Sequence, residues 1–340
     1  MKTFPAEMRP TVCKRIISAI IGIFWAIALP APAAETSLLE KAQNGDVVAQ
    51  IQLASLYAKG DGVPQDHAEA VKWWRKAADQ GNRLAQSILG NAYASGKGVH
   101  RDSGEAVKWY RLAAEQGFAP AQNSLAQMLA AGDGVPQDFA ASVTWLRKAA
   151  DQGMPDAQYS LGLAYANGKG VVKDTTEAAK WYRLAAEQGF APAQSNLGWQ
   201  YQAGDGVRKD SKLAVEWSRK AAEQGYAQAQ YNLAWMYAQG AGVSKDQAEA
   251  VKWLHRAAEQ GHWGAQFNLG LAYADGRGVK RDLVEAYTWM SVAGSLGSTD
   301  TDAREGLLKL EKKMSPEQIT EATSRARDWL AKYQKSGSTK

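Results

Sequence analysis

The fold can be predicted from one stretch whose pattern of residues recurs along the chain. This stretch is residues 190–225, FAPAQSNLGWQYQAGDGVRKDSKLAVEWSRKAAEQG. A Trp, an Asp, a Gly and a Gln of this stretch each recur every 36 residues, in seven copies. Fourteen residues, WYRLAAEQGFAPAQ, occur twice without a substitution, at 109–122 and at 181–194. A fixed period of this length is typical of repeat architectures. The tryptophans that mark the period are Trp73, Trp109, Trp145, Trp181, Trp217, Trp253 and Trp289.

Each copy predicts two helices joined by a short turn. In the quoted stretch, Leu197 and Tyr201 follow one another at the four-residue spacing of one helix face. Gly204 ends this helix, since a glycine adopts the left-handed conformation at a helix C-terminus without strain. Asp210 then caps the second helix, whose apolar face carries Trp217. No helix pair can bury its apolar face alone, so neighbouring pairs are expected to stack into an all-α solenoid of helix-turn-helix repeats.

The predicted organisation places the repeats between two caps. Residues 34–45 match the end of a second helix and are expected to form an N-terminal capping half-repeat. Residues 298–335 break the period and predict C-terminal capping helices over 301–313 and 316–335, and residues 336–340 are expected to form a disordered tail. The seven 36-residue repeats are 46–81, 82–117, 118–153, 154–189, 190–225, 226–261 and 262–297.

Residues 1–33 are typical of a secretory signal peptide. A basic start precedes an uncharged run at 16–29, and small residues stand at Ala31 and Ala33. We expect cleavage after Ala33 and a periplasmic or secreted mature protein without a transmembrane helix; an uncleaved membrane anchor is the alternative. Cys13, the only cysteine, precedes the apolar run, so the processed protein is expected to have no disulfide. Removal of residues 1–33 would lower the formal net charge of the protein from +5 to +2. A charge this small gives little reason to expect a nucleic-acid partner.

The repeat resembles the Sel-one-like repeat, a relative of the tetratricopeptide repeat. The pattern A-x-x-x-L-G-x-x-Y-x-x-G-x-G-V-x-x-D, followed by A-x-x-W-x-x-x-A-A-x-x-G, covers about three-quarters of the chain. The resemblance implies a right-handed α-solenoid and a role as an adaptor or scaffold in protein complexes. Bacterial proteins of this kind are often exported and linked to host interaction, envelope regulation or polysaccharide export. In one copy the matching residues are Ala157, Leu161, Gly162, Tyr165, Gly168, Gly170, Val171, Asp174, Ala178, Trp181, Ala185, Ala186 and Gly189.

The sequence shows no signature of a catalytic, cofactor or metal site. The histidines form no H-x-x-x-H or H-E-x-x-H pair, and we interpret all four as solvent-facing: His67, His100, His255 and His262. No serine occurs in G-x-S-x-G or begins S-x-x-K. The recurring Gly-x-Gly lies between predicted helices and is interpreted as a turn, and the recurring Asp as a helix cap. One cysteine-rich branch of the resembling family is associated with binding or slow hydrolysis of β-lactams, and this chain lacks its paired cysteines.

Two polar ladders are interpreted as structural. Gln50 and its equivalents lie near the inner stripe of the first helices, where we expect them to bond the loop backbone or the next Gln. Arg75 and its equivalents form a basic row on the second helices, which suits phosphate binding. An acidic residue such as Asp79 follows each Arg by four positions, so we favour a row of ion pairs that neutralises itself.

A candidate interaction surface lies on the first helices, opposite the stripe set by Ala, Leu and Tyr. Two positions per repeat face this side, which lines the concave groove in solenoids of this kind; they are Ile51/Ser55, Ser87/Asn91, Asn123/Gln127, Tyr159/Leu163, Ser195/Trp199, Tyr231/Trp235 and Phe267/Leu271. The last four pairs are largely apolar or aromatic, as interaction surfaces are. We predict partner binding by Tyr159, Leu163, Trp199, Tyr231, Trp235, Phe267 and Leu271. The alternatives are that the C-terminal helices cover this strip or that a tight superhelix buries it.

These observations favour a non-enzymatic, exported scaffold that displays its groove to a protein or peptide partner. The second hypothesis is a binder of cell-wall or other envelope polysaccharide, whose aromatic side chains stack on sugar rings, or a weak β-lactam hydrolase. The absence of a nucleophile–base pair argues against catalysis and leaves glycan binding open.

Overall fold

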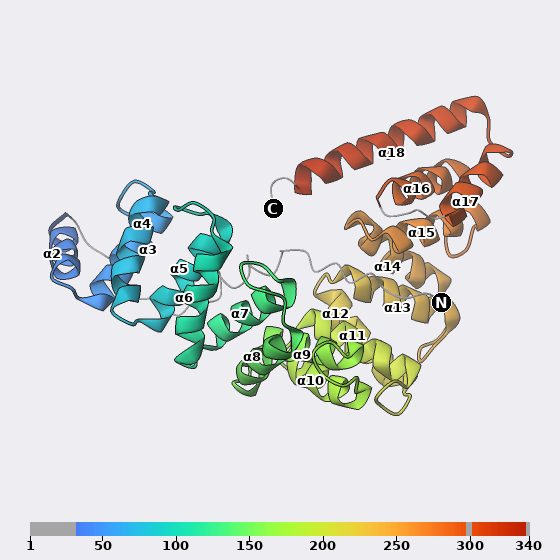
Figure 1. Ribbon diagram of the computed structural model, residues 1–340. Coiled ribbons are helices and arrows are strands. Elements are labelled where there is room, and N and C mark those ends of the chain that lie inside the picture. The colour runs from blue at the N-terminus through green and yellow to red at the C-terminus, as the bar shows by residue number, and fades with distance from the viewer. Residues whose placement is uncertain (1–31, 297–300, 338–340) are drawn as a thin grey trace. The chain divides into compact units, whose positions relative to one another are not determined.

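The computed structural model describes residues 32–296 and 301–337, and every regular element in these two ranges is an α-helix (Figure 1). Residues 1–31 of the predicted signal peptide, which include Cys13, lie outside this part, as do residues 338–340 of the predicted tail. The 17 helices confirm the prediction of an all-α solenoid built from seven consecutive repeats. The chain divides into two compact units, one that ends at Met154 and one that begins at Pro155.

The first unit contains three complete helix pairs preceded by a single helix. The first helix of each repeat packs against the second, and the second packs against the first helix of the next repeat. Helix α2 packs against α3, at the place predicted for the N-terminal half-repeat. The helices of this unit are α2 (Pro32–Gln43), α3 (Val47–Lys59), α4 (His67–Asp79), α5 (Arg83–Ser95), α6 (Ser103–Glu115), α7 (Ala119–Ala131) and α8 (Phe139–Asp151).

The second unit contains four helix pairs followed by two further helices. The same neighbour packing runs from the first pair to the last, and the last repeat also packs against both terminal helices. Its helices are α9 (Pro155–Asn167), α10 (Thr175–Glu187), α11 (Ala191–Ala203), α12 (Ser211–Glu223), α13 (Ala227–Gln239), α14 (Gln247–Glu259), α15 (Trp263–Asp275), α16 (Leu283–Leu296), α17 (Thr301–Glu311) and α18 (Pro316–Gly337). Helix α18 therefore includes the first two residues of the stretch predicted as a tail.

The helix boundaries follow the predicted capping chemistry. The Asp210 carboxylate accepts hydrogen bonds from the backbone N–H groups of Lys212 and Leu213, at 3.0 and 3.1 Å, and so begins α12. Gly204 ends α11 with φ 75°, in the left-handed region. The same Asp and Gly roles recur in the other repeats, which explains why these residues keep the 36-residue step.

The second glycine of each Gly-x-Gly turn allows a close contact between repeats. Gly206 has φ 72°, and a Cβ placed on it would lie 2.0 Å from the carbonyl oxygen of Thr175, at the start of α10. Gly242 approaches Ser211 of the preceding repeat in the same way. The turn of one repeat therefore rests directly on the backbone of the repeat before it, which no residue with a side chain permits.

Leucine and alanine form the centre of the core, and the repeat tryptophans range from buried, as in Trp73 and Trp253, to half-buried. The Leu of each first helix from α5 to α15 is fully buried, namely Leu89, Leu125, Leu161, Leu197, Leu233 and Leu269. The Ala pairs of the second helices are also buried, as in Ala221 and Ala222. Trp217 is only half-buried, and the Lys220 ammonium lies 4.3 Å from its ring centre. The small alanines let the helix backbones approach, and the indole rings fill the space beside them.

Buried glutamines join each repeat to the next. The Gln194 side-chain amide donates to the Ala186 carbonyl at 3.0 Å, and its oxygen accepts from the Gln224 amide at 2.7 Å. The expected partners were the loop backbone or the next Gln of the row; the observed ones are a carbonyl in the last turn of α10 and Gln224, which follows α12 in the same repeat. The same Gln–Gln bond occurs in both units, as Gln80–Gln50, Gln116–Gln86, Gln152–Gln122, Gln188–Gln158, Gln224–Gln194 and Gln260–Gln230.

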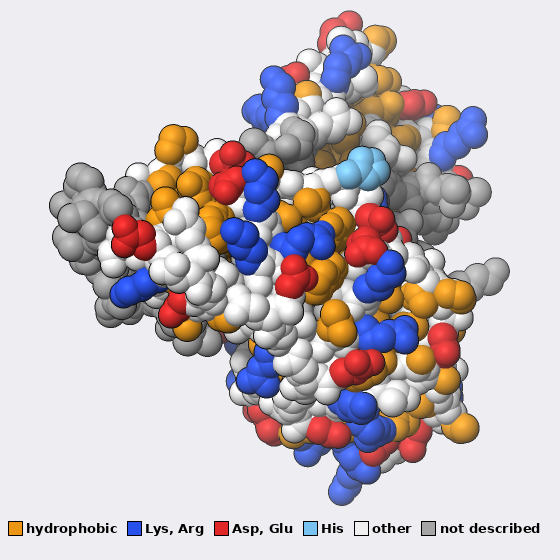
Figure 2. All heavy atoms as spheres, turned by 60° about the vertical axis from the view of Figure 1, so that its left-hand side comes forward, with side chains coloured by type: hydrophobic (Ala, Val, Ile, Leu, Met, Phe, Trp, Pro, Cys, Tyr) orange, Lys and Arg blue, Asp and Glu red, His pale blue; other side chains and the backbone are white. Residues whose placement is uncertain are grey.

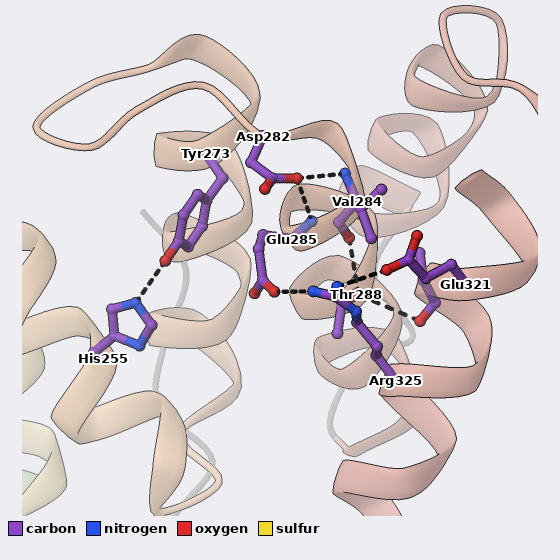
Figure 3. Close-up of polar contacts among 9 residues, drawn as sticks. His255, Tyr273, Asp282, Val284, Glu285, Thr288, Glu321 and Arg325 are labelled. Atoms are coloured by element: carbon purple, nitrogen blue, oxygen red, sulfur yellow. Dashed lines mark hydrogen bonds and ion pairs between the residues drawn. The ribbon is translucent and has the colours of Figure 1, made fainter.

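Polar contacts at the C-terminal end fasten α18 to the last repeat (Figure 3). The Arg325 guanidinium of α18 donates to the Glu285 carboxylate of α16 at 2.5 Å and to Glu321 of its own helix at 2.6 Å. The Thr288 hydroxyl lies 3.3 Å from the Ala322 carbonyl, where the two helices meet in a buried contact. The Trp329 and Trp289 rings also meet, edge to face, with centres 5.9 Å apart.

Candidate functional site

All seven residues of the predicted interaction surface lie on the first helices of the second unit, α9, α11, α13 and α15. Two of them remain open to solvent: Trp199 of α11 and Trp235 of α13 each expose 45% of their surface. They occupy equivalent positions in consecutive repeats, and α11 contacts α13 directly. A pair of exposed indoles on neighbouring helices is the apolar feature of this surface that a partner can reach.

Tyr159 and Leu163 lie at the N-terminal end of this surface and are half-buried. The Tyr159 ring packs against Tyr182 and Phe190, with ring centres 5.8 and 5.4 Å apart. Burial raises the pKa of the Tyr159 hydroxyl above its usual value. Leu163 packs against the core of the unit. These two side chains therefore contribute more to packing than to open surface.

Tyr231 belongs to a cluster that joins α13 to α15. Its ring stacks on the imidazole of His262, with centres 4.6 Å apart, and its hydroxyl accepts a hydrogen bond from Asn268 at 3.3 Å. His262 caps α15, because its Nδ1 accepts from the Ala265 N–H at 3.1 Å. The Nε2 therefore carries the proton and donates it to the Gln228 oxygen, 3.1 Å away. Burial lowers the pKa of His262, which keeps this neutral form in place.

The interpretation of all histidines as solvent-facing is wrong for His255 and His262. Both are half-buried, and burial lowers the pKa of each imidazole. His255 Nε2 lies 3.0 Å from the Tyr273 hydroxyl (Figure 3), and its ring meets Trp289 edge to face. Sequence spacing missed the contacts of His255 with Tyr273 and of His262 with Gln228, because these partners are 18 and 34 residues apart. The cap that His262 forms is local, and its position, which Asn82 occupies in the second repeat, was the available signal.

Phe267 and Leu271 lie where the C-terminal helices approach the strip. Both pack against a cluster whose buried members are Ala286, Met290, Leu310, Met314 and Ala322. A Cβ placed on Gly306 of α17 would lie 3.9 Å from the Phe267 ring. The predicted alternative, in which the C-terminal helices cover the strip, therefore applies to this end of it.

Trp263 is an exposed tryptophan that the sequence reasoning did not single out. It is the first residue of α15 and exposes 47% of its surface. The corresponding residue is Val47 or Arg83 in the first two repeats and Ala119, Pro155, Ala191 or Ala227 in the next four, so the one aromatic residue at this position was the available signal. On the face of the molecule in Figure 2, Lys and Arg as well as Asp and Glu side chains are interspersed among hydrophobic ones.

The arginine row differs from its interpretation as a set of ion pairs. Arg183 and Arg219 donate instead to the hydroxyl groups of Tyr201 and Tyr237, at 2.6 and 2.7 Å. Arg75 donates to Tyr93 in the same manner. Each Tyr belongs to the first helix of the next repeat, so these bonds reinforce the stacking. The acidic residues four positions on form none of the ion pairs found among the described residues.

Within the described ranges, no three His, Cys, Asp or Glu side chains gather closely enough to hold a metal ion. A search of the same ranges finds no helix with the length and apolar character needed to cross a membrane.

The sequence pattern of the Sel1 repeat family matches residues 47–82, 83–118, 119–154, 155–190, 191–226, 227–262 and 263–298. A Sel1 repeat protein from Oxalobacter formigenes is 38% identical, with a TM-score of 0.68 over 82% of this chain and 80% of that one. A protective antigen of uropathogenic Escherichia coli that displays an SLR fold is 31% identical over 88% and 87% of the two chains, with a TM-score of 0.36. A comparison with curated proteins finds no match.

The chain belongs to the Sel1 repeat family. Proteins built from this solenoid are typically scaffolds for protein interactions, and the family is generally non-catalytic. Sel1 repeats thus point to protein partners.

Proposed function

We propose that this protein is an exported scaffold that binds a protein partner through the surface around Trp199 and Trp235. The observation that carries the proposal is the 45% exposure of both indoles on contacting helices. The same repeat position holds smaller side chains in the other copies, among them Asn91 and Gln127. An indole that leaves 45% of its surface in water forgoes part of the stabilisation that full burial gives, whereas buried tryptophans dominate many protein interfaces.

The remaining predicted residues shape this surface rather than form its centre. Tyr159, Leu163 and Tyr231 are half-buried, and Tyr231 lies one helical turn before Trp235 on α13. Their side chains form part of the packed layer under the surface. Phe267 and Leu271 pack in the cluster that holds the C-terminal helices, and they form the C-terminal end of the predicted surface.

Cross-linking in intact cells, followed by mass spectrometry, tests the partner. We expect a specific cross-linked protein with the native chain and its loss with Trp199→Gln combined with Trp235→Gln. Leu184→Gln is the matched control, because Leu184 is also exposed, at 44%, but lies on a second helix. Equal cross-linking by all three forms would disprove the proposed surface.

The proposal of export rests on the basic start, the apolar run and the small residues that precede position 34. The intact mass of the protein purified from its own cells tests it. We expect a chain that begins at Ala34 in the periplasmic or extracellular fraction, and a full-length chain in the cytoplasmic fraction would contradict export.

Glycan binding remains a second candidate, because exposed indoles also stack on sugar rings. A pull-down with purified peptidoglycan and envelope polysaccharide, together with nitrocefin turnover, separates the two. Glycan capture that the double tryptophan variant abolishes, without any cross-linked protein, would replace the first proposal.

A further inference from the structure

A positively charged pocket lies where the fourth and fifth repeats meet, within the second unit. It has a volume of about 690 Å³ and opens between the end of α10, the turn after α11 and the start of α12. Arg183, Arg208 and Lys209 supply three cationic groups to its wall, and Asp210 supplies the one carboxylate. Val207 and Leu213 add apolar surface.

The three cations have no acidic partner in the described part of the chain. Arg183, Arg208 and Lys209 are exposed, and none of them takes part in an ion pair. Arg183 donates one hydrogen bond, to the Tyr201 hydroxyl at 2.6 Å, and the proton of that hydroxyl points to no other partner. The Asp210 carboxylate is engaged as a helix cap by two backbone N–H groups. The wall therefore offers several charged donors that nothing in the described chain satisfies.

The charge of this pocket arises from two departures from the repeat pattern, Arg208 and Leu213. Five copies have a Glu three residues after the capping Asp, namely Glu69, Glu105, Glu177, Glu249 and Glu285. In the fifth copy Leu213 stands at this position. Four of these Glu side chains pair with a Lys three residues on, and Glu285 pairs with Arg325. In the fifth copy Leu213 replaces the Glu and Glu216 stands at the position of its Lys partner, so Asp210 is the one acidic residue in the wall of the pocket.

The junction of the sixth and seventh repeats has a carboxylate at the position that Leu213 occupies in the pocket. There His255, Tyr273 and Glu285 occupy the places of Arg183, Tyr201 and Leu213 (Figure 3). Glu285 there forms an ion pair with Arg325 of α18. Leu213 offers no carboxylate at the equivalent place beside Arg183 and adds apolar surface instead.

The next junction, between the fifth and sixth repeats, provides an internal comparison. Arg219 donates to Tyr237 as Arg183 does to Tyr201. Lys245 stands in the place of Lys209, but Ser244 replaces Arg208 and Glu249 is present. Glu249 is paired with Lys252 there, at 2.8 Å, and the wall has the two cations Arg219 and Lys245, whereas the pocket has the three cations Arg183, Arg208 and Lys209.

We propose that this pocket binds an acidic segment of a protein partner, with an Asp or Glu side chain between Arg183 and Arg208. This inference rests on the proposed scaffold function and names the chemistry of the partner. The ligand carboxylate accepts from the guanidinium groups and from the Tyr201 hydroxyl, and a neighbouring apolar side chain lies on Leu213 and Val207. A free anion in such an open pocket is held only by screened charges, so the apolar wall favours a peptide.

The test uses the full mature chain and a fluorescein-labelled peptide of sequence EELEELEE, followed by fluorescence anisotropy. The matched neutral peptide is QQLQQLQQ. We expect binding of the acidic peptide alone, weaker at higher salt because the attraction is between charges. Leu213→Glu restores the residue of the other copies and is expected to weaken binding at least about fivefold, and Arg208→Gln with Lys209→Gln at least about tenfold.

Arg219→Gln with Lys245→Gln is the matched control, since it removes two cations from the junction of the fifth and sixth repeats. We expect it to change binding less than about twofold. An equal loss in this control would show general attraction to a basic protein and overturn the proposal. Inorganic phosphate that binds as tightly as the peptide, or vesicles with anionic lipid that bind while the peptide does not, would also overturn it.

The variants distinguish a failure of the pocket proposal from a failure of the scaffold proposal. Trp199 and Tyr201 are two residues apart on α11 and so point to different sides of the helix. A partner that is lost with the double tryptophan variant but kept with Leu213→Glu and with Arg208→Gln and Lys209→Gln would sustain the scaffold and refute the pocket. Circular dichroism checks that each variant is folded.

Discussion

At the scale of single residues, positions that depart from the repeat pattern carry the individual character of the protein. His262 stands where Asn82 stands in the second copy, and both side chains cap a first helix. Leu213 stands where most copies have Glu. The repeat tolerates such changes because the Leu and Ala of the core remain in place around them.

The pH dependence of stability is expected to contain a contribution from His262. Burial lowers the pKa of its imidazole, so the unfolded chain binds a proton more readily than the folded one. The contribution is therefore complete above about pH 6.5 and is lost as the pH falls below it. We expect urea unfolding to show a smaller loss of stability between pH 7 and pH 5 for His262→Asn than for the native chain. Equal losses would contradict the capping role of the neutral imidazole; His67 and His255 titrate in both proteins.

Gly206→Ala is expected to destabilise the protein by about 2–4 kcal/mol, because it combines backbone strain with a clash. The new Cβ would lie 2.0 Å from the Thr175 carbonyl oxygen, at a φ of 72°. Gly225→Ala is the control: its φ is 87°, but no atom lies within 4 Å of the new Cβ. We expect that change to cost only about 1 kcal/mol in urea unfolding. Equal costs would show that the contact between turn and helix is unimportant.

At the scale of elements, each helix pair is completed by its neighbour. The Gly206 turn rests on α10, the Arg183 side chain of α10 bonds Tyr201 of α11, and Gln194 connects successive repeats. The period, the helix pairs and the caps were predictable from the sequence, because caps and helix faces depend on residues close together in the chain. The Tyr partner of the arginine row was not, because an acidic residue at the helix spacing offered an equally sound local pairing.

Gln194→Ala is expected to destabilise the protein by about 2 kcal/mol, because it removes two hydrogen bonds made by one buried side chain, each with a net contribution of about 1 kcal/mol. Gln194 is only 4% exposed and makes both bonds at once. Gln239→Ala is the control, because Gln239 is an exposed residue of α13. Urea unfolding of both variants measures the difference, and a cost of Gln194→Ala no larger than that of the control would refute the structural role of the ladder.

At the scale of the whole molecule, contacts between helices join neighbours in the chain, as the packing within each unit shows. Stability in such a protein is approximately a sum over repeats and their junctions. Local damage is therefore expected to stay local, in contrast to a globular domain that unfolds as one.

Leu233→Ala tests this expectation. Leu233 is fully buried in α13, so its truncation is expected to cost about 3 kcal/mol. We expect urea unfolding followed by circular dichroism to broaden or to divide into two steps, and hydrogen exchange to rise chiefly in the helices that contact α13. A single transition with an unchanged slope, and exchange that rises equally everywhere, would show that the chain unfolds as one unit.

The sequence by itself determined the repeat, its helix pairs and the identity of the capping residues, since each of these depends on chemistry within a few residues. It also singled out Trp199 and Trp235, whose side chains are exposed. The packing of the helices alone shows that α17 approaches Phe267, that His262 stacks on Tyr231, and that three cations share a pocket at Leu213. These features depend on side chains that are distant in sequence and meet only when the helices pack.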